Sequence, residues 1–223
     1  MISILMKILL YSSPRAEFPP EEIVEYDELI LRVYEGQLIP KGLPFPKYRF
    51  LQYLTLKGDF VFHGSNNLEI DIFEPRKQTL FNGRKTKAVF ASSEPIWSIF
   101  YAVFDRSKLV GSYRNGCLVY KNKKYHYYSL NKSTMQNNPW TTGMLYILPK
   151  SKFKPTDNGK IHFDEWICHD FVEPVSKLAV GVEDFYYINR VATHMNKESL
   201  LKTWLFYKIR TLRVKSKNTS NVS

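Results

Sequence analysis

Two short motifs contain the residues best suited to chemistry. The first is His63-Gly64-Ser65, which follows the apolar run Asp59-Phe-Val-Phe. Gly64 lets a ligand approach the backbone, while the side chains of His63 and Ser65 offer hydrogen bonds on either side of that gap. Taken alone, the tripeptide is more typical of an ordinary turn after a strand than of a binding site.

The second motif is Asp164-Glu165-Trp166-Ile167-Cys168-His169. If this segment forms a strand, Phe163, Glu165 and Ile167 share one face. Glu165 then stands between two apolar neighbours, where a carboxylate is costly unless it has a partner or a chemical role. The alternative is an edge strand with Glu165 in water, and the pattern alone leaves both interpretations open.

The elements that position these motifs are predicted to be mostly short strands. Asn, Gly and Pro separate the apolar runs, which favours antiparallel pairing. Gly64-Ser65-Asn66-Asn67 is expected to form a turn. We expect strands over residues 1–11, 59–63, 88–91, 117–120, 124–128, 144–148, 161–168 and 177–182.

Apolar residues at helical spacing predict helices over residues 20–35, 48–56, 95–104 and 197–212. The third of these is apolar nearly all round and therefore buried, with Ser92 or Ser93 as its expected cap. The chain is thus predicted to be an α+β protein with helices early and last. Its parts are an N-terminal strand and helical segment (1–57), a core (58–190), and a C-terminal basic helix with a frayed tail (191–223, the tail from Asn218).

Three segments resemble, in order and spacing, the signature of the ADP-ribosyltransferases of the His-Tyr-Glu class, which includes diphtheria toxin and the poly(ADP-ribose) polymerases. They are Phe-Val-Phe-His63-Gly64-Ser65, then Lys87-Ala-Val-Phe-Ala91 before a helix, then Phe163-Asp-Glu165-Trp-Ile-Cys-His. The third is similar to the Asn-Glu-Tyr-Ile-Val-Tyr stretch of the polymerases. The resemblance covers residues 59–182.

This resemblance implies a split, mainly antiparallel sheet whose cleft binds NAD in a bent form. By the same resemblance, His63 bonds the adenosine ribose, the Gly64 main chain bonds the nicotinamide amide, and Ser65 supports that amide. Glu165 is implied to be catalytic: it holds the nicotinamide ribose 2′-hydroxyl and stabilises the oxocarbenium-like charge that develops as nicotinamide leaves.

Other positions extend or depart from the family pattern. Phe90 or Val89 stands where the family has its nicotinamide-stacking Tyr, and Phe90 is able to stack. Ser92 is a further expected NAD contact, and Arg76 either reaches the pyrophosphate or forms a structural salt bridge. Phe163 stands where arginine-modifying transferases carry Glu or Gln, so arginine is not the expected acceptor.

The charge balance indicates an acidic partner. Lys and Arg number 32 against 21 Asp and Glu, a net charge of +11. The macromolecular acceptor is therefore expected to be nucleic acid or an acidic protein, and the basic excess is expected along the C-terminal helix and the Lys121–Lys124 hairpin. Two cysteines indicate a reducing compartment, and no apolar run reaches the ~20 residues of a membrane span, so we expect a cytoplasmic protein. The oligomeric state stays open.

Two other functions compete with a transferase that acts as a toxin or effector. An RNA 2′-phosphotransferase-like enzyme shares the fold, but it needs an Arg-His-His-Arg set and not a Glu. A binding module would retain the fold and hold NAD, ADP-ribose or nucleic acid without catalysis. No metal is expected, because His162, Cys168 and His169 have no second pair of ligands elsewhere.

Overall fold

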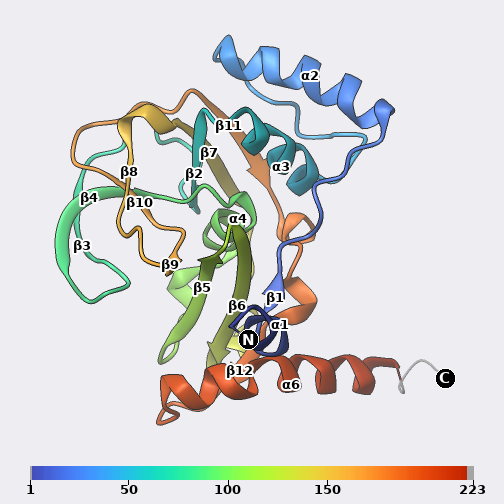
Figure 1. Ribbon diagram of the computed structural model, residues 1–223, viewed down its shortest axis with the longest axis vertical. Coiled ribbons are helices and arrows are strands. Elements are labelled where there is room, and N and C mark those ends of the chain that lie inside the picture. Colours follow the sequence, from blue (N-terminus) through green and yellow to red (C-terminus); the bar gives the residue numbers. More distant parts are fainter. Residues whose placement is uncertain (1, 220–223) are drawn as a thin grey trace.

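The computed structural model describes residues 2–219, with side chains described through residue 212 (Figure 1). Its helices are α1 (Ile2–Leu9), α2 (Pro20–Tyr34), α3 (Lys47–Lys57), α4 (Pro95–Val103), α5 (Lys132–Gln136) and α6 (Leu200–Thr219). Its strands are β1 (Tyr11–Ser12), β2 (Phe60–Ser65), β3 (Arg76–Thr79), β4 (Lys85–Ala91), β5 (Tyr113–Tyr120), β6 (Lys123–Asn131), β7 (Gly143–Pro149), β8 (Lys154–Pro155), β9 (Ile161–Phe163), β10 (Trp166–Cys168), β11 (Ser176–Val180) and β12 (Ala192–His194). Among these residues, no helix combines the length and apolarity of a membrane-crossing segment.

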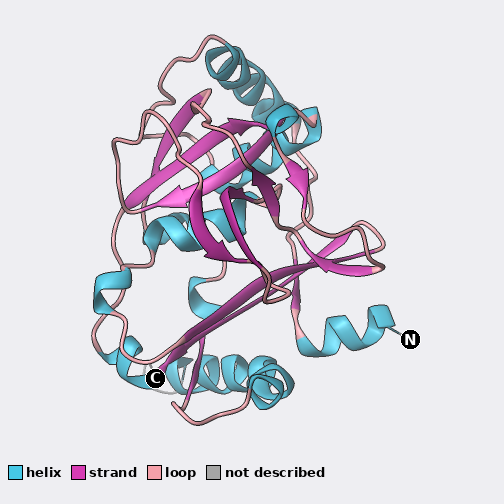
Figure 2. Cartoon of the chain, turned by 90° about the vertical axis from the view of Figure 1, so that its left-hand side faces the viewer, coloured by secondary structure: helices cyan, strands magenta, loops and turns pink. Residues whose placement is uncertain are grey.

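The strands form three sheets. Their orders are β1-β6-β5-β9, with β12 also on β6, then β3-β4-β10-β8, and β11-β7-β2. Apart from β12 on β6, which is parallel, the paired strands run antiparallel. The long β5–β6 hairpin leads from the middle of the molecule to α6 (Figure 2). The predicted α+β class, with mainly antiparallel sheets and helices at both ends, is confirmed.

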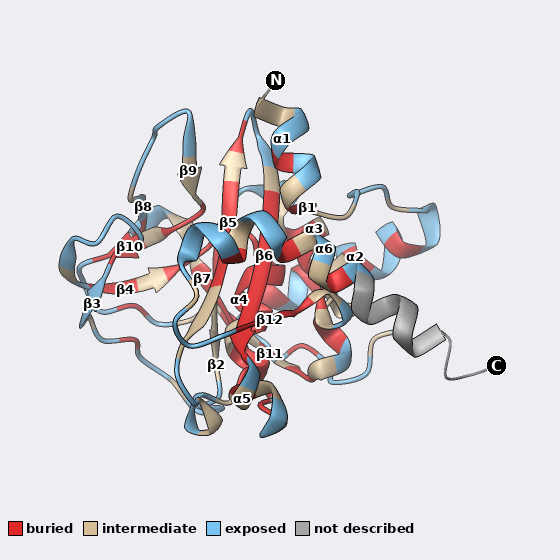
Figure 3. Ribbon diagram, turned by 90° about the horizontal axis from the view of Figure 1, so that it is seen from below, coloured by how far each residue is buried: buried red, intermediate tan, exposed pale blue. Residues whose placement is uncertain are grey.

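The N-terminal helices pack on the same core as the sheets. Proline at the start of α2 and acids in its first turn favour the helix start, as predicted. One face of α2 is buried, and α3 ends at Gly58, whose φ of 81° is open to glycine at little cost. Apolar side chains of both helices join one buried cluster with side chains of α4 and β7. This cluster lies at the centre of the molecule (Figure 3).

Strands β2 and β4 meet at one place and then diverge. The Phe62 N–H donates to the Ser92 carbonyl (2.7 Å), and the Ser92 N–H donates back to the Phe62 carbonyl (2.9 Å). Beyond this bridge, β2 pairs with β7 and β4 pairs with β10, in different sheets. The two sheets therefore open as a wedge on one side of the bridge.

Gly64 lies in strand β2 and not in the predicted turn. Gly64 and Ser65 continue the strand opposite Leu145 and Met144 of β7. A Cβ at Gly64 would lie 2.8 Å from the Ala102 nitrogen and closer still to the Ser98 carbonyl oxygen. The strand can therefore continue under α4 only because residue 64 has no side chain, so this glycine serves helix packing.

Three other expectations about local structure are wrong. The first residues form helix α1 and not a strand, because Met6 packs on one side into a cluster that includes Tyr207 of α6. The expected strand 161–168 is broken at Asp164 and Glu165, so that β9 pairs with β5 while β10 pairs with β4. The side-chain cap of α4 is Glu94, which accepts from the Ile96 N–H, and not Ser92 or Ser93.

Other sequence expectations agree with the observed elements, or extend beyond them. The helices expected over 20–35, 48–56 and 95–104 are α2, α3 and α4. Strands β3, β8 and β12 and helix α5 were not predicted. The expected frayed tail overlaps the backbone of α6 as far as Thr219, and its remaining residues, 220–223, lie outside the described part of the chain.

The close approach of α4 to β2 predicts that Gly64→Ala strongly destabilises the protein. The new methyl group would meet backbone atoms that cannot rotate away, so we expect a loss of about 2 kcal/mol or more in the free energy of unfolding. Chemical denaturation followed by tryptophan fluorescence measures it.

Gly42→Ala is the matched control, because a Cβ at Gly42 has no atom within 4 Å. We expect that variant to lie within about 0.5 kcal/mol of the parent protein. Equal stability of the two variants would show that α4 does not pack on Gly64 as described.

Candidate active site

The wedge between the sheets contains two adjoining cavities. The first has a volume of about 500 Å³ and is lined by β2, β4, α4 and β5, together with Phe81 of the β3–β4 loop and Glu165. The second, of about 440 Å³, lies against the other end of β2 and against β3. They share the residues Phe90, Tyr101, Arg106, Gln78, His63 and Gly64. Both volumes lie in the range of small-molecule sites.

The predicted site residues divide between these cavities. His63, Gly64 and Phe90 line both cavities. Ser92 and Glu165 line only the first. Ser65 and Arg76 line only the second. The segments that carry the two sequence motifs, about 100 residues apart in the chain, thus meet at one cleft.

Glu165 is a buried carboxylate with few partners. The residue is only 7% exposed to solvent. Oε2 accepts from the Thr156 hydroxyl (3.2 Å) and, at 3.4 Å, from the Phe81 N–H. Within the described chain, Oε1 has no hydrogen bond and the carboxylate has no ion pair. Burial raises the pKa of Glu165, against the smaller lowering effects of Phe81 and Thr156.

The adjacent carboxylate, Asp164, is fully satisfied. It accepts from the hydroxyls of Ser92 (2.9 Å) and Ser93 (2.8 Å), and the Lys124 ammonium lies 3.1 Å away. Burial alone would raise the pKa of Asp164, but the Lys124 charge and these hydrogen bonds outweigh it and lower the pKa. Asp164 is therefore an anchor, while Glu165 faces the cavity.

Lys124, which the sequence analysis counted with the basic excess of the Lys121–Lys124 hairpin, is instead paired with acids. Its ammonium lies 3.7 Å from Glu94 as well as 3.1 Å from Asp164, in a buried cluster of charged and polar groups. In the described chain, Glu94, Cys117 and His126 also bring ligand atoms within 4.8 Å of one another. Lys124 already supplies a cation to Glu94, and His126 is bonded to Ser13 and Tyr128, so this cluster is structural.

His63 is held in one tautomer. Its Nδ1 donates to the Phe90 carbonyl (2.6 Å), which leaves Nε2 as an acceptor, and its ring packs edge-on against Phe73. Burial lowers the pKa of His63, and the positive charges of Arg106 and Arg76 lower it further, against the effect of the Phe90 carbonyl. The ring is therefore neutral at pH 7 and joins β2 to β4.

The backbone of Gly64 is open to the cleft. Backbone groups of alternate residues point to the same edge of a strand. The Gly64 N–H and C=O therefore point to the edge where Phe62 bonds Ser92, away from β7. Strand β4 has diverged at this level, and neither group has a hydrogen-bond partner among the described residues. Gly64 thus presents a donor and an acceptor side by side.

Ser92, Ser65 and Arg76 differ in their availability. Ser92 is buried, and its hydroxyl donates to Asp164 and accepts from the Glu94 N–H (2.9 Å), so it organises the site and is not free for a ligand. The Ser65 hydroxyl accepts from the Asn67 N–H (3.1 Å). Arg76 is exposed and has no ion pair within the described residues, so the alternative of a structural salt bridge is not realised there.

Aromatic residues that the sequence analysis did not assign to the site complete the first cavity. Trp97 and Tyr101 lie four residues apart on α4, and both donate to Asn115 Oδ1, at 2.6 and 2.9 Å. The Arg106 guanidinium lies over the Tyr101 ring at 5.2 Å. The sequence did contain a sign of this arrangement, because two aromatic residues with polar groups stand at positions i and i+4 of an otherwise apolar helix.

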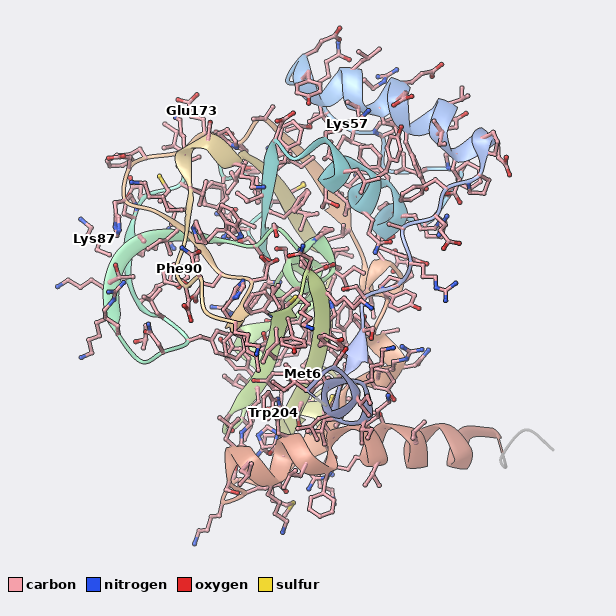
Figure 4. All side chains as sticks on the ribbon, viewed as in Figure 1. Met6, Lys57, Lys87, Phe90, Glu173 and Trp204 are labelled. Atoms are coloured by element: carbon pink, nitrogen blue, oxygen red, sulfur yellow. The ribbon has the colours of Figure 1, made fainter. Side chains whose placement is uncertain are left out.

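Phe81 and Phe90 contribute two further ring faces. Phe81 is 40% exposed and stacks on Phe163 with a centroid separation of 3.5 Å. Phe90 is half-buried at the centre of the cleft wall, while Lys87 on the same strand points outward (Figure 4). The cleft thus combines flat apolar faces, one carboxylate, a neutral histidine and flanking arginines.

No protein-family model, curated protein or solved structure matches this chain.

The environment of Glu165 predicts that Glu165→Gln stabilises the fold at neutral pH. A raised folded-state pKa means that stability is lost as pH rises from the ordinary Glu pKa through the folded value, because the ionised form is the disfavoured one. Gln is uncharged and avoids this loss. A gain of about 1 kcal/mol corresponds to about 2–4 °C in melting temperature.

Thermal melts of both proteins across pH 4–8 measure the effect. The two curves should converge at the acid end, where the parent Glu165 is protonated, and separate as pH rises. A Gln variant that melts below the parent at pH 7 and matches it at pH 4 would mean that the ionised carboxylate has a stabilising partner.

Proposed function

We propose that the protein is an NAD-dependent ADP-ribosyltransferase that transfers ADP-ribose to a macromolecular acceptor other than arginine. The observation that carries the proposal is the buried, unpaired carboxylate of Glu165 in the same cavity as neutral His63 and the open backbone edge of Gly64. The resemblance of the same three segments to the His-Tyr-Glu class supports it.

The nicotinamide end of NAD fits the first cavity. A carboxamide offers one donor and one acceptor, which complement the Gly64 C=O and N–H. The ring needs an apolar face, and Phe90 and Tyr101 supply such faces around it. The carboxylate of Glu165 lines the same cavity, where it would meet the positive charge that passes to the ribose as nicotinamide leaves.

The remainder of NAD fits the second cavity and the boundary between the two. The Arg76 and Arg106 guanidiniums flank His63, and neither is paired with an acid within the described chain. Two arginines suit a pyrophosphate, for which their fork of donors is complementary. His63 Nε2 then accepts from a ribose hydroxyl.

The chemistry follows from the charge of Glu165. The C1′–N bond of the nicotinamide riboside breaks, and its electron pair returns to the ring, which leaves as neutral nicotinamide. The positive charge that develops at C1′ and the ring oxygen is stabilised by the carboxylate. An acceptor atom X forms the C1′–X bond, and the proton of X–H passes to solvent.

One observation favours a binding module as the second candidate. Phe90 has no hydroxyl where the family carries Tyr, so a polar contact of that class is absent at this position. Such a module would bind NAD or ADP-ribose in the same cleft and leave the C1′–N bond intact. Nicotinamide release separates the two candidates.

Glu165→Gln tests the proposal directly. We expect purified protein to release nicotinamide from NAD, and the variant to lose about 10²–10³-fold in turnover, as when one electrostatic stabiliser is removed. The ionised carboxylate is the active form, and its pKa is raised. As pH decreases, the rate of the parent protein should therefore begin to fall at a higher pH than it would with a Glu of ordinary pKa. This acid limb should be absent in the variant.

Glu173→Gln is the matched control, because Glu173 is exposed and lies at the edge of the molecule, away from Phe90 (Figure 4). Calorimetry should show NAD affinity little changed in Glu165→Gln, since the charge acts mainly as the bond breaks. Undiminished nicotinamide release by a folded Glu165→Gln protein would reject the catalytic role. NAD binding with no release by the parent protein would favour the binding module.

The open edge of Gly64 predicts discrimination between nicotinamide and nicotinic acid. Nicotinic acid lacks the N–H₂ donor and places a carboxylate oxygen against the Gly64 C=O, which leaves a repulsive contact. We expect it to bind at least about tenfold more weakly than nicotinamide. Titration calorimetry measures this difference, with benzamide as the control that retains the carboxamide. Equal affinities for the acid and the amide would mean that Gly64 does not read this group.

A further inference from the structure

The β3–β4 hairpin, residues 76–91, is an unbalanced cationic element at the mouth of the cleft. It contains Arg76, Lys77, Arg84, Lys85 and Lys87, and the sequence from Pro75 to Ser93 contains no acid. All five side chains are exposed, and none forms an ion pair within the described part of the chain. Basic residues elsewhere differ, since Lys124 and Arg49 are ion-paired to buried acids.

 

Two of these lysines face each other across the hairpin. Lys77 and Lys87 are directly opposite in the antiparallel register, so their side chains leave the same face of the sheet. Like charges in this arrangement destabilise a strand pair unless an anion lies between them. Lys85 precedes Lys87 by two residues and therefore lies on the same face of β4. The hairpin therefore carries a row of cations whose repulsion a polyanion would relieve.

The position of the hairpin links this charge to the cleft. Gln78, Thr79 and Phe81 line the first cavity, while Arg76 and Lys77 line the second. Phe81, at the turn of the hairpin, is 40% exposed and is fixed by its stack on Phe163. Cations beside a fixed, exposed aromatic ring are the combination that binds the phosphates and bases of a single strand.

We infer that the β3–β4 hairpin binds a single-stranded nucleic acid as the acceptor, with Arg84, Lys85 and Lys87 on its phosphates and Phe81 stacked on a base at the cavity mouth. The inference rests on the proposed function only in naming the acceptor, because binding itself needs no NAD. An acidic protein would satisfy the lysines but would leave the ring of Phe81 without a specific role.

Binding of a fluorescent 20-nucleotide single strand, DNA or RNA, tests the inference with the full chain and no NAD. Affinity should fall steeply with salt, because each phosphate contact releases counterions. Lys85→Gln/Lys87→Gln should lower the log–log salt slope by about 1.4, or about 0.7 per lost contact. Phe81→Ala should weaken binding roughly 5–150-fold with little change of slope, as expected for a lost base stack.

Lys121→Gln/Lys123→Gln is the matched control, because it removes the same charge from two exposed lysines at the β5–β6 turn. The inference predicts an unchanged slope for this control. Equal effects of the two lysine pairs, absence of binding at low salt, or equal competition by polyglutamate of the same charge would overturn it. Nicotinamide release is measured separately, so a failure of strand binding and a failure of NAD cleavage are distinguishable.

Discussion

The paired hydrogen bonds between Phe62 and Ser92 are the contact on which the cleft depends. They hold β2 and β4 together at one level, and beyond it each strand joins a different sheet. The His63 bond to the Phe90 carbonyl lies just past this level and fixes the histidine ring in the opening. The same divergence leaves the Gly64 backbone without a strand partner. A continuous sheet would satisfy these groups and would leave no cleft.

Ser92 connects this junction to Glu165. Its backbone bonds β2, while its hydroxyl bonds Asp164 and the N–H of Glu94 at the start of α4. Asp164 is in turn fixed by Ser93 and Lys124. Adjacent carboxylates thus have opposite environments, because Asp164 has four side-chain donors, one of them the Lys124 cation, while Glu165 has only two weak donors. Asp164, whose hydrogen bonds are satisfied, thereby holds its neighbour Glu165 at the cavity wall.

The sequence predicted what depends on local pattern. The α+β class, the apolar strand before His63, the buried helix α4 and the proximity of residues carrying the two motifs follow from periodicity, turn residues and the resemblance. It failed where distant contacts decide the outcome. Residues 2–9 form a helix because α6 packs against them, and Gly64 stays in a strand because α4 covers it. Lys124 lies in a hairpin of lysines, and only the fold reveals that Asp164 and Glu94 surround it.

The distribution of charge within the cleft follows from these constraints. Glu165 is the one acid among the residues lining the first cavity, and within the described chain it forms no ion pair with the arginines that flank His63. If Arg106 or Arg76 were paired with Glu165, both charges would be neutralised and neither end of the cleft would select a ligand. Because no ion pair joins them, the carboxylate and the two guanidiniums each keep a charge that a ligand in the cleft can meet. Under the proposed function, a ligand whose pyrophosphate lies beside Arg76 and Arg106 extends its nicotinamide riboside into the first cavity, and this brings its glycosidic bond to the side of Glu165.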